Sequence, residues 1–154
     1  MLKYKILAIF LALTIIFSVP MNVNADLATL NLYYYKIQAD NTPVFEQKFI
    51  IIPARLPTQC RAEIIFYLVF NDTIFMPPNV RLISAKFSPE NGLLVINVSR
   101  EIKAYGGNFF ENMLVERILQ NARALPEVKF LTLLIEGQLQ ALPEGSLIYQ
   151  VSVK

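Results

Sequence analysis

Two strand-like runs around one tight turn, in the stretch Val80–Ile102, constrain the fold more than any other part of this sequence. The turn is Pro89–Gly92 (PENG), and Asn-Gly between alternating runs is a strong hairpin signal. Among the polar residues of the second run, Asn97 and Ser99 are expected to face outward. The expected inward set is Ile83, Ala85, Phe87, Leu94, Ile96 and Val98. The stretch therefore predicts an antiparallel hairpin packed over helices.

Helical periodicity lies on both sides of this hairpin, at Thr58–Asn71 and Asn108–Leu125. Thr58 is placed to cap the first helix, and Asn108 with Glu111 forms a capping-box pattern at the second. Apolar residues recur at the spacing of one helix face: Ala62, Ile65, Phe66 and Val69 in the first segment, and Leu114, Val115, Ile118, Leu119 and Ala122 in the second. Three more residues widen the first face and predict cover on more than one side: Ile64, Tyr67 and Leu68.

The other apolar runs predict strands. Leu30–Gln38 and Phe45–Ile52 precede the first helix and are rich in aromatic and β-branched residues. Phe130–Ile135 is apolar on both faces, which is typical of a central strand, and weak alternation over Leu147–Val153 indicates a final edge strand. This order of elements predicts an α+β fold, a two-layer α/β sandwich with two helices on one face of a mixed, mostly antiparallel sheet.

The first 25 residues have the pattern of a secretory signal peptide. Lys3 and Lys5 precede Ile6–Val19, an uncharged apolar run shorter than the roughly 17–25 residues of a membrane-spanning helix. Small residues predict cleavage after Ala25, which leaves 26–154 as a single domain in the extracellular or cell-envelope space. An uncleaved N-terminal membrane anchor is the alternative.

Charge and composition exclude several function classes. Lys3 and Lys5 are two of the 14 basic residues, so 26–154 holds 12 basic and 12 acidic residues. This balance lacks the basic excess expected for nucleic-acid binding. The absence of His and the single Cys exclude zinc sites of the usual kind and Ser-His-Asp or Cys-His catalysis. We therefore predict no catalytic, cofactor-binding or metal-binding residues.

A few polar residues are weak candidates for a site. Cys60 starts the first helix, where the helix dipole can lower a thiol pKa, but a small half-buried side chain is the favoured interpretation. Gly106 and Gly107 lead into the second helix, where an anion can bind, but a turn is favoured. Two carboxylate pairs, Glu111 with Glu116 and Glu63 with Asp72, are interpreted as solvated helix faces rather than a glycosidase dyad.

Aromatic and glycosylation signals are also interpreted conservatively. Tyr33, Tyr34 and Tyr35 are consecutive. They are favoured as strand packing, with a sugar-stacking or partner-binding surface as the alternative. The sequons that begin at Asn71 and Asn97 are interpreted as chance occurrences.

Taken together in order and spacing, several weak motifs resemble the GerMN domain of the sporulation and spore germination GerM family. The resemblance covers Leu30 to Lys154 and lies mainly in Gly92–Glu101 (GLLVINVSRE), Pro126–Gly137 (PEVKFLTLLIEG) and Leu142–Gly145 (LPEG). The chain departs from the family where Pro77-Pro78-Asn79 replaces a Pro-Gly-Thr and where Asn121-Ala122 replaces a Thr-Leu pair. It also lacks the lipid-bearing Cys of many relatives.

The resemblance implies a non-enzymatic envelope module similar to the ring-building motifs of secretion and sporulation channels. The leading hypothesis is an assembly protein that contacts other envelope or sporulation-complex proteins, or further copies of itself. A peptidoglycan or wall-glycan module that uses exposed Tyr33 or Tyr35 is the second, and a small hydrolase is the third.

Overall fold

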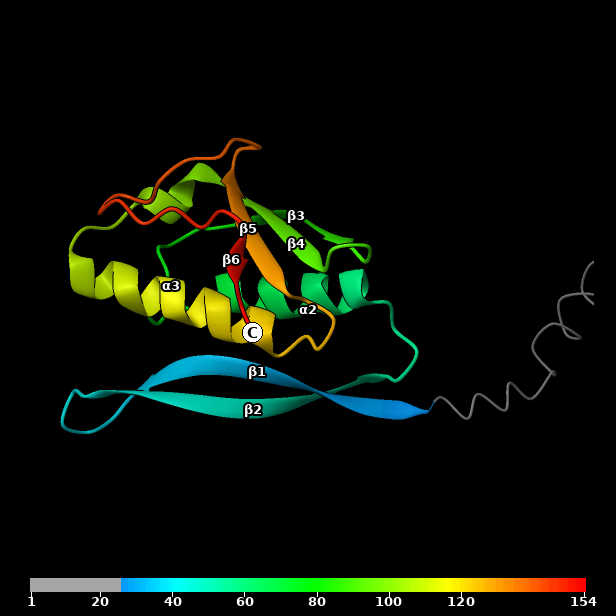
Figure 1. Ribbon diagram of the computed structural model, residues 1–154. Helices are drawn as coiled ribbons and strands as arrows, with labels where there is room; N and C mark the ends of the chain where they lie inside the picture. Colours follow the sequence, from blue (N-terminus) through cyan, green and yellow to red (C-terminus); the bar gives the residue numbers. More distant parts are fainter. Residues whose placement is uncertain (1–25) are drawn as a thin grey trace, which may run out of the picture.

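A computed structural model describes residues 26–154 (Figure 1), and the expected signal peptide lies outside the described residues. The elements in chain order are the strands β1 (Leu27–Ile37) and β2 (Pro43–Pro53), the helix α2 (Thr58–Phe70), the strands β3 (Leu82–Ser88) and β4 (Leu93–Val98), the 3₁₀ helix η1 (Arg100–Lys103), the helix α3 (Asn108–Arg123), and the strands β5 (Phe130–Ile135) and β6 (Val151–Ser152).

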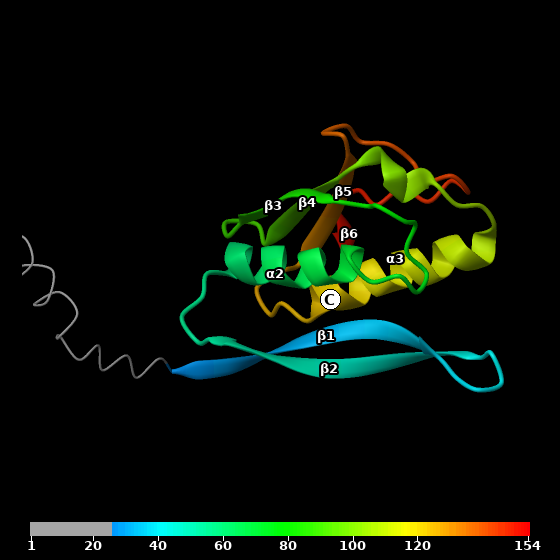
Figure 2. The same ribbon diagram turned by 180° about the vertical axis from the view of Figure 1, so that it is seen from behind.

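The strands form two separate sheets with the two helices between them (Figures 1 and 2). One sheet has the order β3-β4-β5-β6, in which only the β4–β5 pair is parallel. The expected α+β class, with two helices against a mixed sheet, is confirmed. The structure adds a layer to the expected sandwich, because β1 and β2 form an antiparallel sheet of their own on the other side of the helices.

The apolar width of α2 explains this extra layer. The four predicted core residues of α2 are all fully buried, and Ile64 and Leu68 are half-buried against the core. The β1–β2 hairpin contributes Leu30, Leu32 and Ile52, which are 2–5% exposed, to the same core. Burying apolar surface on both sides of the helices removes more of it from water than one sheet could.

The expected inward position of Ile83 is wrong. Leu82 pairs with Val98 and Ser84 pairs with Asn97, so Ile83 is the extra residue of a β-bulge. A bulge shifts the alternation of side chains by one position, and Ile83 is 50% exposed. The other five residues of the predicted inward set behave differently: Ala85, Leu94, Ile96 and Val98 are buried and Phe87 is half-buried.

The expected outward position of Ser99 is also wrong. Ser99 is fully buried, and its hydroxyl oxygen accepts a hydrogen bond of 3.0 Å from the Arg81 amide. The Oδ1 atom of Asn97, which is half-buried, accepts one of 2.8 Å from the Gly137 amide. Ser99 thus joins the end of β4 to the segment before β3 instead of facing solvent, whereas Asn97 lies on the outward face of β4, as expected, and binds the loop after β5.

Near the C-terminus, the central position of β5 is confirmed, and the final edge strand is shorter than expected. Leu147 and Tyr149 are about half exposed, whereas Ile148 between them is buried. The Ile148 carbonyl accepts a hydrogen bond of 2.9 Å from the Leu133 amide. Gln150 has a φ of 49°, a left-handed conformation that interrupts the extended chain, so only Val151–Ser152 form β6.

Neither expected helix cap forms. Pro57 and Gly107 are the N-cap residues, and neither helix has a side-chain capping bond. The Thr58 hydroxyl instead accepts a hydrogen bond of 3.0 Å from Arg61. Glu111 is buried and bound elsewhere, as described below.

Gly92 closes the β3–β4 turn in a conformation that requires glycine. Its φ is 69°, and a Cβ atom there would lie 2.8 Å from Lys129 Cγ and 3.0 Å from the Glu127 carbonyl oxygen. We expect Gly92→Ala to lower the free energy of unfolding by about 2–3 kcal/mol, because left-handed strain and the backbone contact add. Urea denaturation measures this change.

Gly137→Ala is the matched control. Gly137 has a φ of 77°, and a Cβ there meets no described atom within 4 Å. We expect a loss of about 1 kcal/mol, from backbone strain alone. Equal losses at the two glycines would contradict the role assigned to the Lys129 and Glu127 contacts.

Candidate functional site

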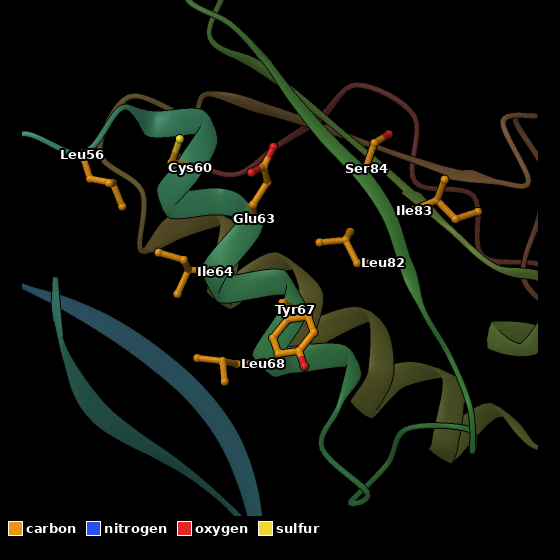
Figure 3. A pocket seen from close by; sticks show the side chains of 9 residues that line it. All are labelled: Leu56, Cys60, Glu63, Ile64, Tyr67, Leu68, Leu82, Ile83 and Ser84. Atoms are coloured by element: carbon orange, nitrogen blue, oxygen red, sulfur yellow. The ribbon is translucent and has the colours of Figure 1, made fainter. Parts of the chain in front are cut away.

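An open apolar groove of about 590 Å³ lies between α2 and β3 (Figure 3). Five of its lining residues come from α2, one from the preceding loop and three from β3. They are Leu56, Cys60, Glu63, Ile64, Tyr67, Leu68, Leu82, Ile83 and Ser84. Figure 3 shows Leu82 between the strand and the helix, so the two elements meet along the groove floor.

Helical spacing and the β-bulge together build this groove. The lining residues of α2 recur every three or four positions, which places them on one face of the helix. The bulge exposes Ile83 on β3, and Tyr67 on the helix is 60% exposed. β3 is also the first strand of its sheet, so its outer edge pairs with no strand among residues 26–154. Apolar surface and an open strand edge therefore lie side by side.

The polar groups of the groove are too few for most catalysis. Glu63 is the one carboxylate that lines it, and its Oε1 atom accepts a hydrogen bond of 3.3 Å from Gln59. Cys60 is the one thiol. An activated nucleophile needs an adjacent general base at hydrogen-bond distance, and no hydrogen bond links Cys60, Glu63 or Tyr67 to one another in the groove. The groove is suited to binding an apolar group.

Cys60 and the glycine pair follow the favoured interpretations. Cys60 is half-buried, although its place in the groove was not predicted. The Gly107 amide at the start of α3 donates a hydrogen bond of 2.6 Å to Glu144 Oε1. The protein's own carboxylate thus occupies the position where an external anion would bind.

Glu111 was missed as a buried structural group. It is 1% exposed. Its Oε2 atom accepts hydrogen bonds from the Tyr105 hydroxyl (2.8 Å) and the Glu144 amide (2.7 Å), and its Oε1 atom accepts one from the Ser146 amide (2.8 Å). Burial raises the pKa of Glu111, but these hydrogen bonds outweigh burial and hold the pKa below its ordinary value. The interpretation of Glu111 as part of a solvated helix face is therefore wrong, whereas Glu116, the other member of that candidate pair, is exposed as expected.

Asp72 likewise belongs to an ion pair and not to a carboxylate pair. Arg117 on α3 is fully buried and donates a hydrogen bond of 2.5 Å to Asp72 Oδ2 and one of 2.9 Å to the Ile74 carbonyl. Burial lowers the pKa of Arg117, and the Asp72 carboxylate opposes this. The position of Arg117 next to Ile118 in the apolar stripe was the available sequence signal.

The tyrosine cluster is packed, as the favoured interpretation expected. Tyr35 is only 4% exposed. Tyr33 stacks on Phe45 with ring centroids 5.7 Å apart. The Tyr34 hydroxyl donates a hydrogen bond of 2.8 Å to Glu46, which raises the pKa of the phenol. The alternative interpretation, in which Tyr35 is exposed for sugar stacking, is therefore not supported.

Residues 26–154 lack two further features. No helix in this range is both long and apolar enough to cross a membrane. The same range contains no cluster of three or more Asp, Glu or Cys side chains arranged to bind a metal ion.

Comparison with solved structures identifies the fold. The tandem GerMN domains of the sporulation protein GerM from Bacillus subtilis superpose with a TM-score of 0.62 at 15% identity, over 88% of this chain and 49% of that one. The first GerMN domain of the same protein gives a TM-score of 0.56 at 16% identity, over 81% of this chain and 97% of that one. This chain has a GerMN-like fold. The resemblance noted in the sequence is thus confirmed at the level of the fold.

The GerMN-like chain spans about half the length of the tandem protein and nearly all of the single domain. A putative lipoprotein from Clostridium perfringens is also similar, with a TM-score of 0.49 at 18% identity, over 75% of this chain and 79% of that one. No family model and no curated protein matches the sequence.

Proposed function

We propose that this chain is an exported, non-enzymatic module of the cell envelope that takes part in assembling a sporulation or germination complex through protein–protein contacts. The GerMN-like fold supports this proposal, because the similar structures belong to a sporulation protein. The signal-peptide pattern of residues 1–25 supports export.

The observation that carries the proposal is the apolar groove between α2 and β3. Tyr67 and Ile83 are at least half exposed on its walls. Contiguous exposed apolar surface beside polar residues is typical of a protein interaction site. An open strand edge can accept an extended segment by strand addition. The partner that fits best is an extended, apolar segment of another envelope protein.

The two other hypotheses have less support. A wall-glycan module would need exposed tyrosines, but Tyr35 is buried and Tyr33 is half-buried against Phe45. A hydrolase would require a pair of facing catalytic groups, and Glu111 and Asp72 are each hydrogen-bonded to other partners within the fold.

An Ile83→Asp variant tests the groove. We expect it to weaken the retention of envelope proteins by at least about tenfold, because a charge then replaces an apolar contact on the groove wall. For this test, the exported form of the chain is purified and immobilised. Solubilised envelope from the same host is passed over it, and the retained proteins are quantified by mass spectrometry. The expected partners are proteins of the sporulation or germination complex.

Lys86→Ser, on the exposed face of the same strand, is the matched control and should retain the partners fully. Both variants should keep the stability of the parent chain within about 0.5 kcal/mol, because both positions are exposed. Retention of purified wall material in place of proteins would favour the glycan module. Equal retention by all three chains would exclude the groove as the binding site.

A further inference from the structure

The outer edge of β2 is a second open strand edge. β1 lies between β2 and the helices (Figures 1 and 2), and β2 pairs only with β1 among the described residues. The β1–β2 register is regular over the whole length of β2, from Pro43 to Pro53. Natural proteins protect such an edge with bulges, prolines or charged side chains, above all Lys. The β2 register has no bulge, and its two charges, Glu46 and Lys48, are of opposite sign. On β2, prolines stand only at the two ends.

A side chain of α3 shows which way the β2 backbone groups point. The Tyr33 amide donates to Asn121 Oδ1 (3.0 Å), and the Tyr33 carbonyl accepts from Asn121 Nδ2 (2.8 Å). The backbone groups of Tyr33 therefore point away from β2. Gln47 lies opposite Tyr33, so this is a non-hydrogen-bonded pair, and the amide and carbonyl of Gln47 point to the open edge.

The same orientation recurs at every second residue. Phe45, Phe49 and Ile51 therefore present their amides and carbonyls at the edge together with Gln47. Phe49 and Ile51 are also the most exposed apolar side chains of the strand, at 67% and 70%. The edge thus offers a row of backbone hydrogen-bonding groups beside exposed apolar surface.

The side chains around Gln47 are complementary to a second copy of themselves. In an antiparallel pair centred on Gln47, Glu46 lies opposite Lys48 of the second copy, and Phe45 lies opposite Phe49 of the second copy. Only odd-numbered residues of β2 point their backbone groups to the open edge, so an odd-numbered residue must lie opposite an odd-numbered residue of the second copy. The next possible registers are therefore shifted by two residues. The nearest alternatives place Glu46 opposite Glu46, or Lys48 opposite Lys48, and like charges directly opposite each other are destabilising. Charge therefore favours the register centred on Gln47 over its two nearest alternatives.

We propose that two copies of this chain pair through β2, antiparallel and centred on Gln47, so that their hairpins form one four-stranded sheet. The interface is isologous, because a twofold axis passes between the two Gln47 residues. This inference deepens the assembly role proposed above by naming one contact between copies, and it uses a surface separate from the α2–β3 groove.

Sedimentation of the exported chain over a range of concentrations tests the pairing. We expect a dimer whose dissociation constant rises at least about tenfold in Lys48→Glu, because two pairs of carboxylates then face each other. The double variant Glu46→Lys with Lys48→Glu should restore the dimer, because opposite charges again face each other. The proposal would be overturned by a strictly monomeric parent chain, or by a dissociation constant that is the same in the parent chain and both variants.

A disulfide tests the register independently of charge. Residues directly opposite in a hydrogen-bonded pair have Cα atoms about 5.5 Å apart, within disulfide range. In a Cys60→Ser background, Gln47→Cys should form a covalent dimer on mild oxidation. Ile51→Cys, whose counterpart is Pro43 of the second copy, should not. Equal cross-linking at both positions would refute this register. Failure here with partner retention in the groove intact would sink the pairing and leave the proposed function standing.

Discussion

Replacing Asp72 by asparagine is expected to lower the free energy of unfolding by about 3 kcal/mol, because it leaves the Arg117 guanidinium buried without its counter-charge. Arg117 is fully buried, and the Asp72 side chain is 25% exposed. The Arg117 Nε atom has no hydrogen-bond partner among the described residues, so the remaining polar contact would be the Ile74 carbonyl. Urea denaturation of the variant and the parent chain measures the difference.

Two further variants separate charge from packing. Arg117→Met combined with Asp72→Asn should be more stable than Asp72→Asn alone, because no charge then remains buried. Asp26→Asn is the matched control, since the Asp26–Arg55 pair is 3.9 Å apart with side chains 73% and 93% exposed. We expect Asp26→Asn to change stability by less than about 0.5 kcal/mol. Equal losses in Asp26→Asn and Asp72→Asn would contradict this account.

Glu111→Gln is expected to cost about 3 kcal/mol without creating a cavity. The amide of glutamine has one acceptor oxygen and one donor nitrogen, so it cannot satisfy the Tyr105 hydroxyl and the Glu144 and Ser146 amides together. An unsatisfied buried donor costs about 1–3 kcal/mol. Thermal and urea unfolding at neutral pH measure the loss. Glu116→Gln, on the exposed face of the same helix, should change stability by less than about 0.5 kcal/mol.

The pH dependence of stability gives a second readout for Glu111. The folded-state pKa of Glu111 lies below its ordinary value of 4.5, so the unfolded chain binds a proton more readily. The contribution of Glu111 is therefore fully present well above pH 4.5 and is lost as the pH falls through the folded-state pKa. We expect the parent chain to lose more stability than Glu111→Gln over this acid range. Parallel acid profiles would refute the role of the carboxylate.

Local patterns predicted the elements that depend on one periodicity. The apolar faces of α2 and α3, the β3–β4 hairpin and the central β5 all follow from spacing and turn chemistry. Each is specified by residues close in sequence, such as the Asn91-Gly92 turn. The regular alternation of β4 was also sufficient to place Leu94, Ile96 and Val98 inward.

Polar side chains inside the fold were predicted least well. Ser99 and Glu111 were expected at the surface or at a helix cap, but both are buried. Apart from Tyr105, which is close in sequence to Glu111, their partners lie 18 to 35 residues away. Periodicity describes which face of an element is apolar and contains no information about such distant donors.

In the candidate site, too, local periodicity was predicted and contacts between distant segments were not. The spacing of Ile64, Tyr67 and Leu68 was visible as a widened helix face, but the wall that β3 forms opposite it was not. That wall exists because a one-residue bulge turns Ile83 outward on β3.

The amino-acid sequence alone was sufficient for the α+β class, the two helical faces and the hairpin, because these depend on local spacing and residue type. Three-dimensional packing decided that β1 and β2 leave the main sheet, that Asp72 pairs with Arg117, and that the outer edges of β2 and β3 pair with no strand among residues 26–154. Those outcomes depend on which apolar surfaces are still exposed to water after the two helices have packed. These surfaces exist only in the folded chain, so local spacing in the sequence does not reveal them.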